Sequence, residues 1–239
     1  MSERSSGSRR SAWVALLLLV PIPTLGTTVA MVVAPGPVGN TAFALCKIWI
    51  LTLPALWWLW VERGRPSWSP PVQGGLVAGA GLGLILATVI VAAFWLIGVS
   101  RIDPELLRTA TEGMGLATPL AYLGGALYWI FVNSVLEEYV FRWFVFRQCE
   151  RLMPGPAAVT AAAAVFTAHH IIALNAYLDP LLTTLASVGI FIGGATWSWC
   201  YLRYRSIWPG WISHAIVDVA VFGIGWWIIF GTWRCPTRI

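Results

Sequence analysis

Two adjacent glutamates lie inside an apolar stretch that is long enough to cross a membrane. Glu137 and Glu138 stand between Leu136 and Tyr139, and Arg142 follows four residues after the second acid. A charged side chain at the centre of a membrane helix costs about 2.5 kcal/mol or more, so a chain that places two acids there is expected to use them. The pair therefore indicates acid/base chemistry within the membrane.

The two glutamates are expected to have different surroundings on a helix. Glu138 and Arg142 are four residues apart and share one face, where the cation can neutralise the acid. Glu137 points about 100° away and lacks that partner. A buried carboxylate without a countercharge binds a proton more readily, which makes Glu137 a candidate general base. The alternative is a structural ion pair that joins two helices, with Glu137 reaching toward the membrane surface.

The three histidines of the chain also fall in apolar segments at membrane depth. His169 and His170 follow Phe166 at the end of an alanine-rich stretch, and consecutive side chains on a helix point in different directions. At most one of these two is therefore expected to face the site of the glutamates, and a hydrogen bond to a nearby carbonyl is the simpler interpretation for His169. His214 and Asp218 are four residues apart, so both lie on one helical face.

Two histidines and a carboxylate also suit zinc or iron. Glu137, His170 and His214 would be the ligands, although the chain has no His-Glu-x2-His motif. Paired glutamates with separate histidines equally suit a metal-free reaction in which a carboxylate and an imidazole activate water. We expect no cofactor, and zinc is the alternative.

The composition predicts an integral membrane protein. The chain has 239 residues, of which 58% are hydrophobic and 10% charged, whereas a soluble domain carries about 25% charged residues. A membrane-spanning helix needs about 20 apolar residues. Seven segments meet or approach this length, and dividing the last one would give eight spans. The segments are about 12–33, 41–61, 74–99, 120–146, 156–174, 181–202 and 207–230.

These spans predict an all-α, polytopic transmembrane helical bundle with an intramembrane catalytic cavity. No linker is long enough to separate domains, so we expect one integral membrane domain. Its parts are the N-terminal spans and loops at 1–118 and a helical core at 119–239. In the third span, Gly75, Gly79 and Gly83 lie one turn apart and predict a face that packs closely against another helix.

The distribution of basic residues predicts a cytoplasmic N-terminus and a multi-pass protein of the cell membrane. Ten of the 15 Lys and Arg residues fall on the side of the N-terminus, which agrees with the positive-inside rule. Because topology explains the net charge of +5, this charge does not indicate nucleic-acid binding. The ten residues are Arg4, Arg9, Arg10, Arg63, Arg65, Arg142, Arg147, Arg151, Arg203 and Arg205.

The three motifs, in this order, resemble the CPBP family of intramembrane glutamic endopeptidases. That family includes type II CAAX prenyl endopeptidases and bacteriocin-processing relatives, and it shows Glu-Glu-x3-Arg, then Phe-x3-His, then His-x3-Asn or Asp. The resemblance extends over about residues 120–230. The corresponding residues here are Glu137-Glu138-x3-Arg142, Phe166-x3-His170 and His214-x3-Asp218.

The resemblance implies a role for each residue of the motifs. Glu137 and His170 would activate a water, and His214 and Asp218 would form the oxyanion site. Glu138, with Arg142, would be structural or would position the substrate. Asp218 raises one question, because an aspartate donates a hydrogen bond only when it is protonated. It would either stay neutral or orient His214, which would then donate alone.

The resemblance also implies the class of substrate. Relatives remove the tail that follows a prenylated cysteine, process bacteriocins, or cleave membrane-anchored tails. We expect a membrane-anchored protein or peptide as substrate, the lipid bilayer as surroundings, and no nucleic acid; the sequence does not indicate an oligomeric state. The competing hypothesis is a non-enzymatic membrane protein, such as an immunity factor, a scaffold or a proton-coupled carrier.

Overall fold

Most of the chain folds into helices that are long and apolar enough to cross a membrane. The computed structural model describes the backbone of residues 2–231 and the side chains of residues 8–231. Arg4, assigned above to the inner side, therefore lies outside the described side chains. Within the described part there are seven candidate spans, which confirms the all-α bundle and favours seven spans over eight. They are Ser8–Val33, Pro37–Val61, Leu76–Ser100, Pro119–Glu150, Gly155–Asn175, Pro180–Tyr204 and Trp208–Phe230.

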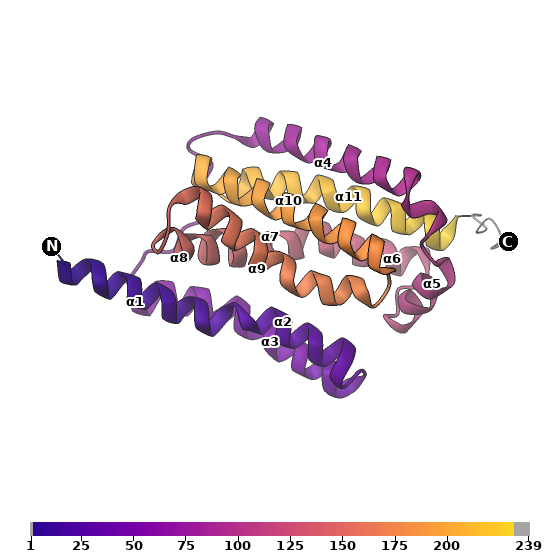
Figure 1. The fold of residues 1–239 in the computed structure, drawn as a ribbon, viewed down its shortest axis with the longest axis horizontal. Helices are drawn as coiled ribbons and strands as arrows, with labels where there is room; N and C mark the ends of the chain where they lie inside the picture. The colour runs from indigo at the N-terminus through magenta and orange to yellow at the C-terminus, as the bar shows by residue number, and fades with distance from the viewer. Residues whose placement is uncertain (1, 232–239) are drawn as a thin grey trace.

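The first two spans form a hairpin of nearly continuous helices. Proline at the first position of a helix supplies a suitable φ and lacks only an N–H that would have no partner there, and both α2 and α3 begin in this way. The hairpin lies on the opposite side of the molecule from α4 (Figure 1). Its elements are α1 (Ser2–Leu19), α2 (Pro21–Thr28), η1 (Val29–Val33), α3 (Pro37–Leu56) and η2 (Trp57–Val61).

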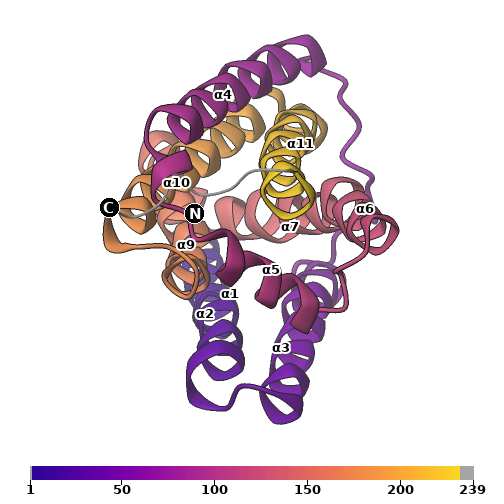
Figure 2. The ribbon, with the colours of Figure 1, turned by 90° about the vertical axis from the view of Figure 1, so that its right-hand side faces the viewer.

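The third span packs along the last one through glycines. α4 (Leu76–Leu96) lies beside α11 (Trp208–Phe230) in both views (Figures 1 and 2). A Cβ at Gly83 would lie 2.8 Å from the Cα of Ser213, and a Cβ at Gly79 would collide with the carbonyl of Pro209. The prediction of a close packing face is confirmed for Gly79 and Gly83, and this face holds the part of α11 that carries His214. Gly75 instead precedes the helix with a φ of +93° and faces the ring of Tyr204.

A short helix lies between the third and the fourth span. η3 (Gly98–Ser100) ends the span, and α5 (Pro104–Gly113) follows. The side chain of Asp103 caps α5 by accepting hydrogen bonds from backbone N–H groups in its first turn. Arg108 on α5 then donates to the carbonyls of Ile228 and Ile229, which ties α5 to the end of α11.

The fourth span carries both glutamates and changes its winding around them. A π-helical turn has i→i+5 hydrogen bonds and is frequent at functional sites. Two π segments flank a single short α-helical piece, and the two glutamates lie at the junction between that piece and the second π segment. The order is α6 (Pro119–Tyr128), η4 (Trp129–Asn133), α7 (Ser134–Glu137), η5 (Glu138–Phe146) and α8 (Arg147–Glu150).

The last three spans enclose η5. α9 (Gly155–Asn175) packs against α10 (Pro180–Tyr204), and α10 packs against α11. Both α9 and α10 also contact η5, whose aromatic and aliphatic side chains form the centre of the buried core. Trp211 of α11 donates a hydrogen bond of 3.0 Å to the hydroxyl of Ser134, one turn before the glutamates. These contacts bring three histidine-bearing and acid-bearing helices to one place.

Candidate active site

Glu138 is the buried centre of an ion cluster that joins two spans. Its side chain is fully buried, and Arg142, one turn later, is 1% exposed. Its Oε1 atom lies 3.3 Å from Nη1 of Arg142 and accepts a hydrogen bond of 3.0 Å from Nδ1 of His214 on α11. The expected pairing of Glu138 with Arg142 is confirmed, and the contact with His214 is an addition that spacing along the chain did not predict.

Aromatic rings and a carbonyl complete the surroundings of Arg142. The guanidinium carbon lies 4.4 Å from the ring centre of Phe166 and 5.0 Å from that of Trp197, distances at which a ring attracts a cation. Nη2 lies 3.5 Å from the carbonyl oxygen of Gly194. Phe166, the first residue of the Phe-x3-His motif, therefore supports the ion cluster as well as the histidine that follows it.

His214 is fixed on one edge and on one face. Its Nδ1–H is committed to the carboxylate of Glu138, and its ring stacks on Trp197 at 3.8 Å between centroids and 14° between planes. The indole N–H of Trp197 donates to the hydroxyl of Ser213 at 3.1 Å, which holds that ring in turn. The remaining nitrogen, Nε2, lies 3.7 Å from Glu137 and 3.8 Å from Asp218.

Glu137 has an uncharged hydrogen-bond partner on its own helix. The amide nitrogen of Asn133, one turn earlier, donates a hydrogen bond of 2.7 Å to Oε1 of Glu137. The amide oxygen of Asn133 accepts a hydrogen bond of 2.7 Å from Nζ of Lys47 on α3. The spacing argument considered only the charged residue four positions after each acid, so it did not indicate this amide four positions before.

His169 and His170 both lie near Glu137 and do not diverge as expected. Their ring centroids are 4.1 Å apart, and each interacts electrostatically with the Glu137 carboxylate. The His170 ring packs on Phe166 at 4.6 Å, and its Nδ1 donates to the Phe166 carbonyl at 2.8 Å. His169 instead stacks on Phe141 at 5.6 Å with 10° between planes.

The hydrogen-bond partners determine which histidine nitrogens remain available. A carbonyl oxygen or a carboxylate only accepts, so Nδ1 of both His170 and His214 must carry a hydrogen. Neutral His170 therefore keeps a lone pair on Nε2, where it can accept a proton. Asp218 is 20% exposed, and its distance of 3.8 Å from His214 Nε2 is too long for a hydrogen bond but short enough for an electrostatic interaction.

The four predicted catalytic residues come together from three spans. His214 lies 3.7 Å from Glu137 and 3.8 Å from Asp218, and His170 is within electrostatic range of Glu137, although these residues lie as much as 81 positions apart in the chain. Lys47 and Asn133 are members of the site that the sequence interpretation missed. One signal was present, because Lys47 is a lysine in the middle of an apolar span, where a charge needs a partner.

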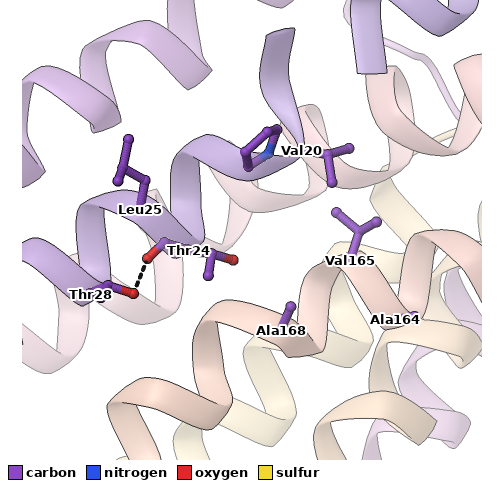
Figure 3. A pocket seen from close by; sticks show the side chains of 8 residues that line it. Val20, Thr24, Leu25, Thr28, Ala164, Val165 and Ala168 are labelled. Atoms are coloured by element: carbon purple, nitrogen blue, oxygen red, sulfur yellow. Dashed lines mark hydrogen bonds between the residues drawn. The ribbon is translucent and has the colours of Figure 1, made fainter. Parts of the chain in front are cut away.

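A separate apolar cavity lies between the hairpin and α9. Its volume is about 640 Å³, and none of the four predicted catalytic residues lines it, so it is not the expected catalytic cavity. Thr28 donates to the carbonyl of Thr24 along one wall, and α9 forms the other (Figure 3). The lining residues are Val20, Pro21, Thr24, Leu25, Thr28, Ala164, Val165 and Ala168.

The zinc alternative would place the metal on Glu137, His170 and His214. Across the described residues, 2–231, no group of three His, Cys, Asp or Glu side chains is placed to hold a metal ion. The predicted zinc ligands Glu137, His170 and His214 each commit one atom to a protein partner, through Asn133, Phe166 and Glu138 respectively. Each residue keeps a second donor atom, Oε2 of Glu137 and Nε2 of each histidine, and a histidine that binds a metal usually donates its other N–H to such a partner. These hydrogen bonds therefore fit the zinc alternative as well as the metal-free reaction.

Comparison with known proteins assigns the part of the chain that holds this site. Residues 119–220 match the family model described as type II CAAX prenyl endopeptidase Rce1-like. No curated protein and no solved structure matches the chain. The matched segment contains both glutamates, Arg142 and the predicted catalytic histidines, whereas Lys47 lies outside it.

Proposed function

Because residues 119–220 match the type II CAAX prenyl endopeptidase Rce1-like family, a family of hydrolases, we propose that the chain is an intramembrane endopeptidase. Its substrate is a membrane-associated or lipid-anchored protein or peptide, cleaved at a peptide bond near the C-terminal tail or in a bacteriocin-type precursor. The observation that carries the mechanism is the placement of Glu137 beside His214, with His170 within electrostatic range.

The nucleophile is a water activated by Glu137 and His170. Oε1 of Glu137 is engaged by Asn133, while Oε2 lies 3.7 Å from His214, beyond hydrogen-bond distance. Oε2 can therefore accept a hydrogen bond from water. His170 contributes the lone pair on Nε2, because its Nδ1–H is occupied by the Phe166 carbonyl. One of the two groups takes the proton as the water oxygen attacks the peptide carbonyl.

His214 stabilises the oxyanion that forms on the peptide carbonyl. Its ring cannot rotate freely, because Glu138 holds Nδ1 and Trp197 covers one face. In the protonated imidazolium form the ring carries a hydrogen on Nε2 as well as on Nδ1. That hydrogen can point at the developing charge without reorganisation, and such preorganised donors account for much of enzymatic rate enhancement. Asp218, at 3.8 Å from Nε2, favours that hydrogen electrostatically. The proton taken from water then passes to the leaving amine.

The reaction takes place on the cytoplasmic side of the membrane centre. This placement follows from the predicted topology, in which the helix of Glu137 runs inward and ends near Arg147. Glu137 lies 10 residues before Arg147, which corresponds to roughly 15 Å of helix. A tail that enters the membrane from the cytoplasmic side is therefore the class of substrate that fits.

The test is a comparison of protein termini in the native host. One strain produces the wild-type chain and another produces Glu137→Ala at equal membrane abundance. Glu112→Ala, which changes an exposed acid on α5, is the matched control. We expect a small set of new termini in membrane-anchored proteins to disappear only in Glu137→Ala. Identical terminal maps in all three strains would favour a non-enzymatic scaffold or carrier.

A second measurement separates the metal-free reaction from the zinc alternative. Purified protein is analysed for bound metal, and cleavage is measured with and without a chelator. We expect cleavage to persist after chelation, because the proposed steps use only side chains and water. Loss of cleavage that zinc restores would establish the zinc-dependent reaction instead.

A further inference from the structure

Lys47 is a half-buried cation within a span, and the matched catalytic segment does not supply it. It lies in the middle of α3, where a lysine costs about 2.5–3.5 kcal/mol at the centre of a membrane helix. Its side chain is half-buried, and Nζ donates a hydrogen bond of 2.7 Å to Oδ1 of Asn133. A hydrophobic residue would cost less here, so the lysine is expected to have a use.

The chemistry of Asn133 makes this contact directional. A lysine ammonium only donates and a carboxylate only accepts, so an amide between them has one allowed orientation. The oxygen of Asn133 faces Lys47, and its NH2 group faces Glu137 at 2.7 Å. Asn133 is 7% exposed, which shields both hydrogen bonds from competing polar groups. The three residues form a chain from the N-terminal hairpin to the predicted base.

A second contact holds α3 in this register. The hydroxyl of Tyr139, two residues after Glu137, donates to the carbonyl of Leu51 at 3.2 Å. Leu51 lies one turn after Lys47 on α3. Two hydrogen bonds therefore fix the same turns of α3 and of the glutamate helix against each other.

We propose that Lys47, acting through Asn133, is a positioning residue for the Glu137 carboxylate. This inference rests on the proposed function, because it assumes that Glu137 is the base. Asn133 holds Oε1, so that Oε2 stays turned toward His214 and the attacking water. Lys47 also places a positive charge two hydrogen bonds away from this carboxylate. The N-terminal hairpin is then part of the catalytic unit rather than only a membrane anchor.

The first experiment measures cleavage kinetics of full-length protein in lipid vesicles for four variants. Lys47→Met removes the cation, Lys47→Arg retains it, and Asn133→Asp replaces the donor that faces Glu137 with a second carboxylate. Ile48→Met, at a neighbouring position that is 58% exposed, is the matched control. A misplaced catalytic group can cost about 100-fold in rate. We expect Lys47→Met and Asn133→Asp to lose up to about 100-fold in kcat with little change in KM, and we expect Lys47→Arg to recover most of the rate.

The second experiment reports on Glu137 without requiring activity. Removing a nearby cation favours the neutral acid. The infrared band of a protonated carboxyl group should therefore appear in Lys47→Met at a pH where the wild type lacks it. That band should vanish when Glu137→Gln is added. The other ionisable groups that interact electrostatically with Glu137 remain unchanged in this comparison: His169, His170, His214, Asp218 and Arg142.

The outcomes separate this inference from the proposed function. Wild-type kcat and an unchanged infrared spectrum in Lys47→Met, with Glu137→Gln inactive, would overturn the positioning role and leave the protease intact. A fully active Glu137→Gln would overturn the proposed mechanism, and the infrared band would then decide alone whether Lys47 controls the carboxylate. A failure of Lys47→Arg to recover the rate would also contradict the inference.

Discussion

The two sides of one helical turn differ in how completely their acids are enclosed. On one side, Glu138 is fully buried and meets Arg142 and His214 directly. On the other side, Glu137 is 16% exposed and is linked to Lys47 through Asn133. Its Oε2 atom lies 3.7 Å from Nε2 of His214, which is beyond hydrogen-bond distance.

This difference shows how one sequence element can build a rigid support and a reactive group together. The partners of Glu138 are other protein charges and rings, which leave no room for a substrate. The partners of Glu137 leave Oε2 available. Adjacent acids on a helix point to different sides, so a Glu-Glu pair is a compact way to supply both roles. Substitutions that affect one side and not the other can test this division.

Glu137→Gln is expected to have the largest effect. The amide is nearly the same size but cannot take a proton, and general base catalysis contributes about 100-fold to 10,000-fold in rate. We expect cleavage by purified protein to fall by at least about 100-fold, with membrane insertion and thermal unfolding close to wild type. Full activity of this variant would contradict the proposal that Glu137 is the reactive acid and Glu138 the structural one.

Glu138→Gln should instead damage the fold. It removes the charge that balances Arg142, and breaking a buried ion pair in this way costs about 3–5 kcal/mol. We expect a clear fall in the thermal unfolding temperature together with loss of cleavage. Equal thermal stability of Glu137→Gln and Glu138→Gln would show that the two sides do not differ.

Gly210→Ala tests the enclosed side with a smaller change. A Cβ at this position would lie 2.8 Å from Oε2 of Glu138, and overpacking of a core costs about 1–3 kcal/mol. Gly189→Ala on α10 is the matched control, because no atom lies within 4 Å of its added Cβ. We expect only Gly210→Ala to lower the unfolding temperature; equal effects would mean that the enclosed side tolerates added volume.

Asp179→Ala should have the smallest effect, because this acid lies outside both regions. The backbone N–H of Leu182 donates to the Asp179 carboxylate at the start of α10, and together with Arg101 it holds the pKa of that group below the ordinary value. The stabilisation is therefore present above the ordinary Asp pKa of about 3.9 and is lost as the pH falls through the lower value in the folded protein. We expect a slightly lower unfolding temperature at neutral pH and convergence with wild type in acid.

Asp179→Asn provides the control for that prediction. Asparagine also caps helices well but does not titrate. Its unfolding temperature should match the wild type at neutral pH and should show less dependence on acid. A pH dependence equal to that of the wild type would assign the effect to another group.

The spans could be predicted from sequence because membrane depth depends mainly on local composition. The seven predicted segments agree with the seven observed spans to within several residues at each end. Contacts within one helix were also accessible, and the pairing of Glu138 with Arg142 follows from spacing alone. The helix α5 was missed because its polar, short sequence carries no membrane signal.

The contacts between spans could not be predicted in the same way. The hydrogen bonds of Glu138 to His214 and of Lys47 to Asn133 join residues 76 and 86 positions apart. Their existence depends on which helices pack together and at what rotation, which hydropathy does not specify. The π segments also change the direction in which side chains of the glutamate helix point. A hydropathy pattern with a period of 3.6 residues assumes an α-helix and does not reveal them. The family resemblance supplied candidate roles but not these partners.

The π segment before the glutamates has a consequence for how such a site can change over time. A π turn contains about one more residue than an α turn, so η4 behaves like a single inserted residue in the helix. Deleting one residue between Trp129 and Val132 would therefore let the helix return to α geometry while the segments on both sides keep nearly the same alignment. A deletion in the α-helical segment before it, between Tyr122 and Tyr128, would instead turn everything that precedes it by about 100° relative to the glutamates. Tyr122, which donates to the carbonyl of Phe222 on α11, would then lose its alignment with the acids. Loss of one residue should therefore be tolerated far better in η4 than in α6.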